Sequence, residues 1–384
     1  MRRGASLRLL LRRTARLGPR LPGRPPVGRL LALCLVSALL FGTLAAAGPA
    51  PVPMVPRPPL VGFSFSPQAA LYLGEDPDRT LTTLLVRLRP DLVRLPVYWS
   101  DVAPTPDGFD FAEVDRMLAL IRGFDSRHHA HTRAVLVVGA RNIDYPELHV
   151  PGWMPIDPTL RMPSLLRSAA YRAYLRTVVL RYAADPLLDA WQIENEPLDD
   201  VAGPGIDAAV SVSTMASEIR LAKSADPAHP VVVTTYNSAG LNLDQRQLSP
   251  LSGLYSILPG PHAVGHPLPA LTLGDVLGLD VYVVTPTTPL SDASARKRIH
   301  WKQSTLAFWA EQARLQGKQL WITEMQSSPW VTGAGFTIND LYYSAQEYRA
   351  EGASVVLLWG VEQWVQDPIW MRAGQRAFRL LREG

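Results

Sequence analysis

From Val61 to the C-terminus, short apolar segments alternate with longer segments whose apolar residues recur every three or four positions. The short segments are nearly continuous in Val, Leu and Ile, which is typical of parallel strands covered on both faces. We predict eight strands, over Val61–Ser66, Asp91–Val97, Arg133–Gly139, Leu188–Glu194, Pro230–Thr235, Leu277–Val283, Lys318–Thr323 and Ser354–Leu358. Eight strands with helices between them predict an α/β fold, a single (β/α)8 TIM barrel over residues 61–384.

The segment between the third and fourth predicted strands illustrates the helical pattern. Tyr171, Tyr174, Val178 and Tyr182 recur at helical spacing, and the arginines among them fall on the opposite side. We expect this tyrosine and valine stripe to pack against the sheet as part of the core.

Residues 1–48 have a different pattern. Nine arginines lie before residue 30, and Leu30–Ala47 is an uncharged, mostly apolar run. This arrangement predicts a signal peptide or a signal anchor whose arginines stay in the cytoplasm. The small residues Ala45, Ala46 and Ala47 offer a cleavage site. We therefore expect an extracytoplasmic protein, either secreted or held at the membrane by this segment, with a Pro-rich linker over residues 49–60 before the barrel.

The leader also accounts for the charge of the chain, which is formally +4. Without those nine arginines, 29 basic side chains face 34 acidic ones, a net charge of −5. A mildly acidic domain gives no support for nucleic acid as a partner. The only cysteine, Cys34, lies in the leader, so an intrachain disulfide is not possible.

Two segments place a glutamate at the end of a predicted strand. Trp191-Gln192-Ile193-Glu194-Asn195-Glu196-Pro197 ends the fourth strand, and Leu320-Trp321-Ile322-Thr323-Glu324-Met325-Gln326 ends the seventh. The carboxyl ends of barrel strands meet at one face, which carries the active site in enzymes of this architecture. Cleavage of a glycosidic bond with retention needs two carboxyl groups about 5–5.5 Å apart, one as acid and one as nucleophile. We expect Glu196 and Glu324 to meet this requirement, whereas we interpret Glu194 as a buried structural carboxylate.

The Asn-Glu-Pro at strand four and the glutamate at strand seven resemble the clan of (β/α)8 retaining glycoside hydrolases, which includes the cellulase-like family 5 and families 39 and 42. The resemblance covers the chain from about Val61 onward. It implies that Glu196 is the acid/base, that Glu324 is the nucleophile and that Asn195 binds the sugar 2-hydroxyl. It further implies an oligosaccharide or polysaccharide substrate and no cofactor.

Three further residues agree with the resemblance. Arg94, in Val93-Arg94-Leu95-Pro96, resembles the arginine that lies beside the nucleophile in the clan. Tyr282 ends strand six, where many relatives have a tyrosine that touches the nucleophile. Trp359 ends strand eight, where relatives place an aromatic platform under the sugar, and sugar faces stack well on indole rings.

Strands three and six depart from the family pattern. Asp280 stands where family 5 often has a histidine, and no histidine follows strand three at the position usual in cellulases. The next loop instead carries His149 and Trp153, which we consider as residues that either line the sugar site or pack within the loop. These departures weaken the expectation of a cellulase substrate, but not of the mechanism.

Two alternatives stay open. A barrel of this kind can be a non-catalytic carbohydrate-binding or scaffold protein at the cell envelope, although the joint presence of both glutamates, Arg94 and Asn195 argues against it. The histidines His128, His129 and His131 precede strand three, on the face away from the predicted site, and we expect a solvated turn rather than a metal site. The sugar, the linkage and the oligomeric state do not follow from the sequence.

Overall fold

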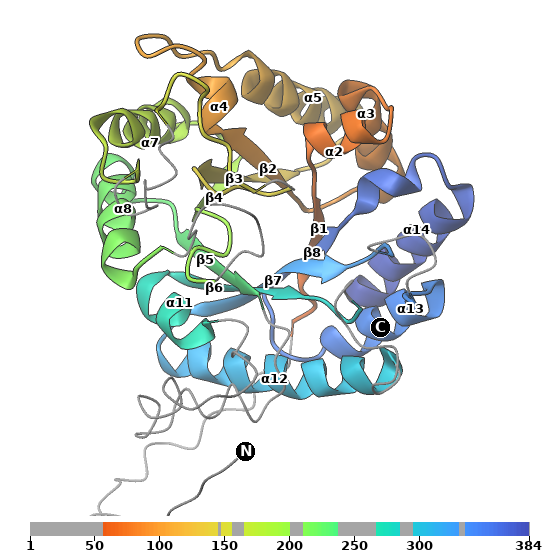
Figure 1. Cartoon of the computed structure of the whole chain (residues 1–384). Coiled ribbons are helices and arrows are strands. Elements are labelled where there is room, and N and C mark those ends of the chain that lie inside the picture. The colour runs from red at the N-terminus through yellow and green to blue at the C-terminus, as the bar shows by residue number, and fades with distance from the viewer. Residues whose placement is uncertain are drawn as a thin grey trace, which may run out of the picture. The chain divides into compact units, whose positions relative to one another are not determined.

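Eight parallel strands close into one barrel in sequence order, and β1 pairs with β8 to complete the ring (Figure 1). This confirms the predicted (β/α)8 architecture. Their bounds are β1 Leu60–Ser64, β2 Leu92–Tyr98, β3 Arg133–Gly139, β4 Leu188–Ile193, β5 Val231–Tyr236, β6 Val276–Val281, β7 Gln319–Gln326 and β8 Val355–Trp359. The bounds agree with the predicted strands to within two residues except in β7, which continues through Gln326.

The computed structural model describes residues 57–144, 147–155, 165–199, 210–236, 266–284, 295–329 and 335–383. The predicted leader, 1–48, and most of the predicted linker lie outside these residues. Within the described ranges, no helix combines the length and the apolar character that crossing a membrane requires.

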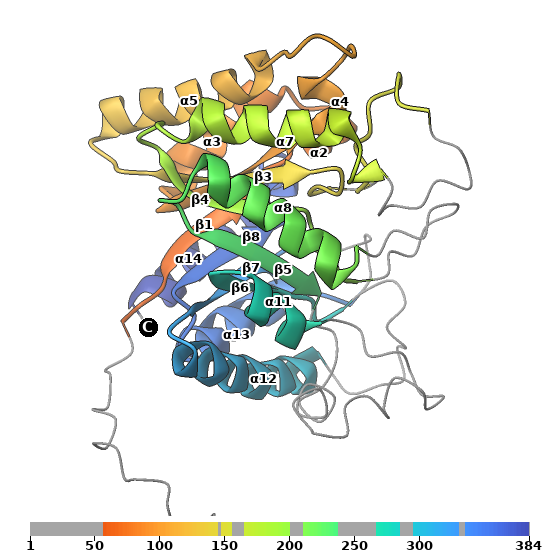
Figure 2. The same ribbon diagram turned by 90° about the vertical axis from the view of Figure 1, so that its left-hand side faces the viewer.

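Helices surround the strands on the outside (Figures 1 and 2). They are α2 Pro67–Tyr72, α3 Pro77–Leu88, α4 Trp99–Val102, α5 Ala112–His128, α7 Ala169–Tyr182, α8 Val212–Ala225, α11 Pro267–Leu273, α12 Ala295–Leu315, α13 Ile338–Tyr348 and α14 Pro368–Glu383, with the 3-10 helix η1 Val361–Trp364 after β8. Several begin at a side-chain cap. Ser168 accepts from Tyr171 N at 3.1 Å and Ser211 from Thr214 N at 3.2 Å, and Thr337 forms a capping box with Asp340.

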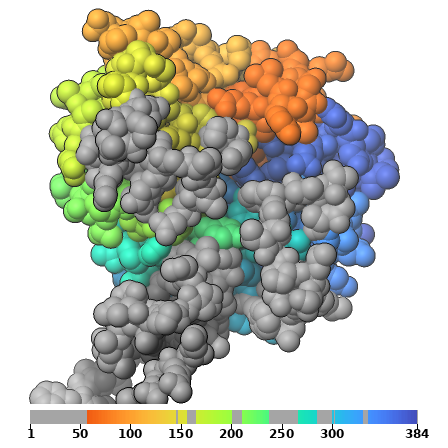
Figure 3. Space-filling model, viewed as in Figure 1, coloured from red at the N-terminus to blue at the C-terminus, as the bar shows by residue number. Residues whose placement is uncertain are grey.

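Two apolar layers hold the barrel together. One fills the barrel interior with alternate residues of the strands, since successive side chains of a strand point to opposite faces. Its members are Leu92, Val135, Ala190, Val232, Val276, Trp321, Val355 and Leu357. The larger layer lies between strands and helices and includes the predicted stripe of α7, which is buried as expected. The two ends of the described chain meet there, because α14 packs against α3 and β1 (Figure 3).

Candidate active site

The backbone at the end of β4 has an unusual conformation. Glu194 and Glu196 have φ values of 59° and 42°, in the left-handed region that non-glycine residues rarely adopt. Hydrogen bonds hold both in place. Glu194 N donates to Val138 O at 2.9 Å, and Glu196 N donates to Thr234 Oγ1 at 2.9 Å. Strained backbone that its surroundings fix in this way is concentrated at functional sites.

Arg94 of β2 connects four parts of the barrel inside the mouth. Its side chain is fully buried and forms an ion pair with Glu324, Nη1 to Oε1 at 2.7 Å. Nη2 donates to Asn195 Oδ1 at 2.7 Å, and Nε donates to Gln192 Oε1 at 2.7 Å. Nη1 also donates to Ser64 Oγ at 3.1 Å. One guanidinium therefore fixes Glu324 relative to Asn195, the residue next to Glu196.

The position of Glu324 depends on a bulge in β7. Leu279 pairs with Ile322, but Asp280 pairs with Glu324, so Thr323 is the extra residue on the β7 side. Glu324 is 4% exposed. Its Oε2 accepts a hydrogen bond from the Tyr282 hydroxyl, while Oε1 accepts from Arg94. The Arg94 guanidinium and the Tyr282 hydroxyl are thus both hydrogen-bond donors to this carboxyl group, an arrangement that suits a negatively charged carboxylate.

Glu196 has a contrasting environment. The residue as a whole is partly exposed, but its carboxyl group is buried. Burial of its carboxyl group raises its pKa well above the ordinary value, and the acidic neighbours Asp280, Glu147 and Glu324 raise it further whenever they are ionised. Glu196 thus has a carboxyl group with a raised pKa and Glu324 has a carboxyl group that accepts from two donors, so the two groups differ in their surroundings.

Buried polar groups behind Glu196 hold the chain on either side of it. Glu194, fully buried, accepts from Ala140 N at 3.0 Å and from Arg141 N at 2.5 Å, and the Tyr171 hydroxyl of α7 also donates to it. The Arg141 side chain donates to Asp199 O at 2.8 Å and pairs with Glu147 at 3.1 Å. Burial raises the pKa of Glu194 to about 7. This network connects the end of β3 to both sides of Glu196.

The structure places the other predicted residues around the same face, with different surroundings. His149 is 5% exposed and stacks on Tyr98 at 3.9 Å, and burial lowers its pKa to about 4, so it is neutral at pH 7. Trp153 donates from Nε1 to Ala103 O at 2.7 Å and packs edge-on to Trp99. Both have the packing contacts of loop residues. Trp359 is partly exposed at the end of β8, beside Gln326 of β7.

Sequence reasoning missed Gln192, Asp280, Arg141 and Glu147 as parts of the site. Gln192 and Asp280 carried a signal, since each is a polar residue on the inward-facing positions of an otherwise apolar strand. Arg141 had the weaker signal of a charged residue directly after β3. For Glu147 no signal in the sequence pointed to the site, because a loop brings it there.

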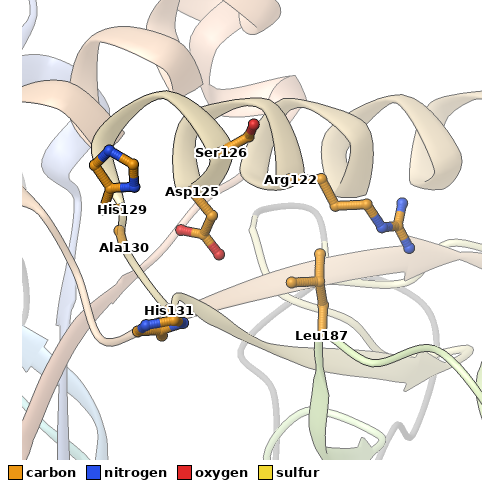
Figure 4. A pocket seen from close by; sticks show the side chains of 7 residues that line it. All are labelled: Arg122, Asp125, Ser126, His129, Ala130, His131 and Leu187. Atoms are coloured by element: carbon orange, nitrogen blue, oxygen red, sulfur yellow. The ribbon is translucent and has the colours of Figure 1, made fainter.

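The three histidines before β3 lie at the opposite end of the barrel. A hollow of about 460 Å³ opens there, with His129, His131 and Asp125 toward one end and Arg122 and Leu187 toward the other (Figure 4). His129 ends α5 in the left-handed conformation, with φ of 51°. No group of three or more potential metal ligands occurs among the residues that the structure describes.

Comparison with known proteins identifies the fold. No protein-family model matches the chain, and no curated protein has a similar sequence. Among solved structures, GH5_18 from Streptomyces cattleya in complex with GlcNAc matches with a TM-score of 0.61 at 14% identity, over 85% of this chain and 81% of the other. GH5_18-E140A from Bifidobacterium longum subsp. longum in complex with Manβ1-4GlcNAc matches with a TM-score of 0.58 at 14% identity, over 83% and 78%.

An exo-β-1,4-mannosidase from Opitutaceae bacterium strain TAV5 also matches, with a TM-score of 0.54 at 18% identity, over 84% of this chain and 59% of that one. The first two neighbours bear the name of glycoside hydrolase family 5, one of the families of the clan that the sequence resembles. At such identities the likeness concerns the fold, and the chain has the closed (β/α)8 barrel that these glycoside hydrolases share.

Proposed function

We propose that the protein is a retaining glycoside hydrolase that cleaves a β-glycosidic bond without a cofactor. The observation that carries this proposal is the contrast between two carboxyl groups at one barrel mouth. The pKa of Glu196 is raised, whereas Glu324 receives hydrogen bonds from Arg94 and Tyr282. This chemistry requires one carboxyl that donates a proton as the acid and one carboxylate that attacks as the nucleophile, and these surroundings suit Glu196 for the first role and Glu324 for the second.

In the proposed reaction Glu324 attacks the anomeric carbon while Glu196 gives its proton to the leaving oxygen. Glu196, now ionised, then takes a proton from the water that releases the sugar from Glu324. Arg94 and Tyr282 hold the nucleophile in one orientation, so little reorganisation is needed at attack. Asn195 directly precedes Glu196 in sequence, and its Oδ1 accepts from Arg94, which leaves its amide nitrogen to face a sugar hydroxyl.

The substrate class follows from the neighbours rather than from the site. Two of them are solved with Manβ1-4GlcNAc and a third is named an exo-β-1,4-mannosidase. We therefore propose β-mannosides as the first substrates to examine, ahead of cellulose. The loops that select a sugar lie largely outside the described residues.

Turnover of aryl β-mannosides, β-glucosides and related glycosides tests the proposal, with the anomer of the first product read by NMR. We expect retention. Glu324→Ala abolishes turnover, and azide restores part of it as a glycosyl azide of inverted configuration. Glu196→Gln lowers turnover by about 10²- to 10⁴-fold, the usual contribution of a general acid. An inverted sugar product, or full activity of Glu324→Ala, rules the mechanism out.

We also propose that the barrel works outside the cytoplasm, on the strength of the leader in residues 1–48. Fractionation of cells that express the full chain should find it in the membrane or in the medium. A product confined to the cytosol contradicts this.

A further inference from the structure

Asp280 is a third carboxyl group in the barrel mouth that the proposed reaction does not use. It lies on β6, four residues after Val276, so it shares with that residue the face that lines the barrel interior. Its side chain is 0% exposed. Oδ1 accepts a hydrogen bond from Thr323 Oγ1 at 2.6 Å, and Oδ2 has no hydrogen-bond partner in the described structure.

The neighbours of Asp280 come from every side of the mouth. Glu324 of β7 is directly opposite in the strand register, and Tyr236 of β5 is opposite on the other side. The Glu196 carboxyl is close enough to lower the pKa of Asp280 by hydrogen bonding, an effect smaller than those of burial and of the Glu324 charge, which raise it. In turn, an ionised Asp280 would have the largest effect of any neighbouring charge on Glu196 and would raise its pKa. The titratable and charged groups around it are Glu196, Glu324, Arg94, Tyr236 and Tyr282.

Only one of these groups is a cation. The charge of Arg94 is matched by Glu324 in the resting site, since the two form an ion pair at 2.7 Å. An ionised Asp280 would be a second buried anion beside that pair, without a cation of its own. Burial and the Glu324 charge accordingly raise the pKa of Asp280 well above its ordinary value.

We propose that Asp280 stays protonated throughout the reaction and donates a hydrogen bond from Oδ2 to the Glu196 carboxylate whenever Glu196 has lost its proton. This inference rests on the proposed glycosidase function. Asp280 acts through Glu196 and is a positioning residue, because it exchanges no proton with the substrate. In this state Oδ2 of Asp280 bears the proton, and the Glu196 carboxylate is the hydrogen-bond acceptor that Oδ2 otherwise lacks.

Protons and charges balance over the two steps of the proposed reaction. In the first step the bond from the anomeric carbon to the leaving oxygen breaks, Glu324 bonds to that carbon, and the Glu196 proton moves to the leaving oxygen. Glu324 is now an uncharged ester, and the Glu196 carboxylate balances Arg94. In the second step water gives a proton to Glu196 and its oxygen to the sugar, and Glu324 is again the anion. One carboxylate faces one guanidinium at each stage, and Asp280 keeps its proton.

The first test reads the proton directly and needs no activity. Protein labelled with ¹³C at the aspartate carboxyls is compared by NMR at pH 7 with its Asp280→Asn variant, and the resonance that disappears belongs to Asp280. We expect the chemical shift of a protonated carboxylic acid. The matched control is Asp275→Asn, one residue before the same strand, where the hydrogen bond from Lys223 lowers the aspartate pKa. Its missing resonance should be that of a carboxylate. A carboxylate shift for Asp280 at pH 7 overturns the proposal.

The second test separates a proton donor from a mere space filler. Asp280→Asn keeps a neutral hydrogen-bond donor, and its kcat should fall by less than about tenfold. Asp280→Leu removes the donor, and its kcat should fall by about 10- to 100-fold, as expected for the loss of a hydrogen bond to a charged group. Without the donor the Glu196 carboxylate is less stable, so the alkaline limb of the kcat/KM profile moves to higher pH in Asp280→Leu. A shift to lower pH in both variants shows that Asp280 is ionised in the working enzyme and overturns the proposal, as do equal losses with no shift.

The two hypotheses fail in different ways. A wild-type protein without turnover on any glycoside contradicts the proposed function, but the NMR result still decides the protonation of Asp280. If Asp280→Leu does not fold, the comparison of wild type with Asp280→Asn by NMR remains decisive.

Discussion

The ion pair between Arg94 and Glu324 gives a prediction that does not depend on the substrate. Arg94→Met removes the only cation that contacts Glu324 in the described structure and leaves that carboxylate buried, at 4% exposure. Breaking a buried pair in this way costs about 3–5 kcal/mol of unfolding free energy. Gln192 Oε1 also loses its donor, Arg94 Nε at 2.7 Å, which adds about 1–3 kcal/mol.

The converse change should cost less. Glu324→Gln leaves Arg94 with its acceptors on Gln192, Asn195 and Ser64, so the guanidinium stays hydrogen-bonded. We expect a loss of about 1–3 kcal/mol from that variant. In the double variant no uncompensated carboxylate remains, so the two losses should not add, and the coupling free energy should be about 2–4 kcal/mol.

Urea denaturation of the wild type, both single variants and the double variant measures this coupling, provided that the m-values agree. Asp189, which Arg133 contacts at 3.4 Å on the surface, supplies a control cycle, and Arg133→Met with Asp189→Asn should show coupling under about 1 kcal/mol. Additive losses within about 0.5 kcal/mol for Arg94 and Glu324 refute the reasoning, because they mean that the carboxylate does not depend on the guanidinium.

Three other changes have expected outcomes. Tyr282→Phe removes the hydroxyl that donates to Glu324; kcat on an aryl glycoside should fall about 10- to 100-fold, and an unchanged kcat speaks against a positioned nucleophile. Arg141→Met removes the hydrogen bond to the Asp199 carbonyl, which helps to hold the chain that follows Glu196. If the Glu196 carboxyl is displaced by about 1 Å, kcat should fall by some 10²-fold, and a wild-type kcat would show that the arginine does not position the acid. Burial raises the pKa of Glu362 from 4.5 to about 8. The folded protein thus binds a proton that the unfolded chain releases, and stability falls as pH rises between these values. Glu362→Gln should therefore gain stability relative to wild type from about pH 5 to about pH 8 in urea denaturation, and a constant difference contradicts this sign.

The barrel was predictable because its strands are buried on both faces and therefore read as continuous apolar runs. The end of β7 was not, since the bulge at Thr323 inserts one residue and lets the strand continue to Gln326. A bulge depends on the register with the neighbouring strand, and a single strand sequence does not contain that register.

The same distinction applies to the candidate site, where residues on strands were predictable and residues on loops were not. Arg94, Tyr282 and Glu324 were placed together from the sequence because each ends or lines a strand, and the structure has them in contact. The contribution of Glu147 comes from a loop, whose path depends on tertiary packing. For His149 the residue type allowed two interpretations, a residue that lines the sugar site or one that packs within the loop, and the stack of its ring on Tyr98 is a tertiary contact that the sequence does not contain.

The left-handed backbone at Glu196 implies a trade-off between stability and activity. A non-glycine residue at φ of 42° costs about 1–2 kcal/mol relative to glycine. Glutamine has the same conformational penalty, so Glu196→Gln removes the acid without relieving the backbone strain. Glycine at this position removes both the strain and the acid. Random mutagenesis selected for thermal tolerance alone should thus favour glycine at this position, and the most stable barrels it yields would have lost their acid. Selection for heat resistance in this protein has to be coupled to selection for turnover.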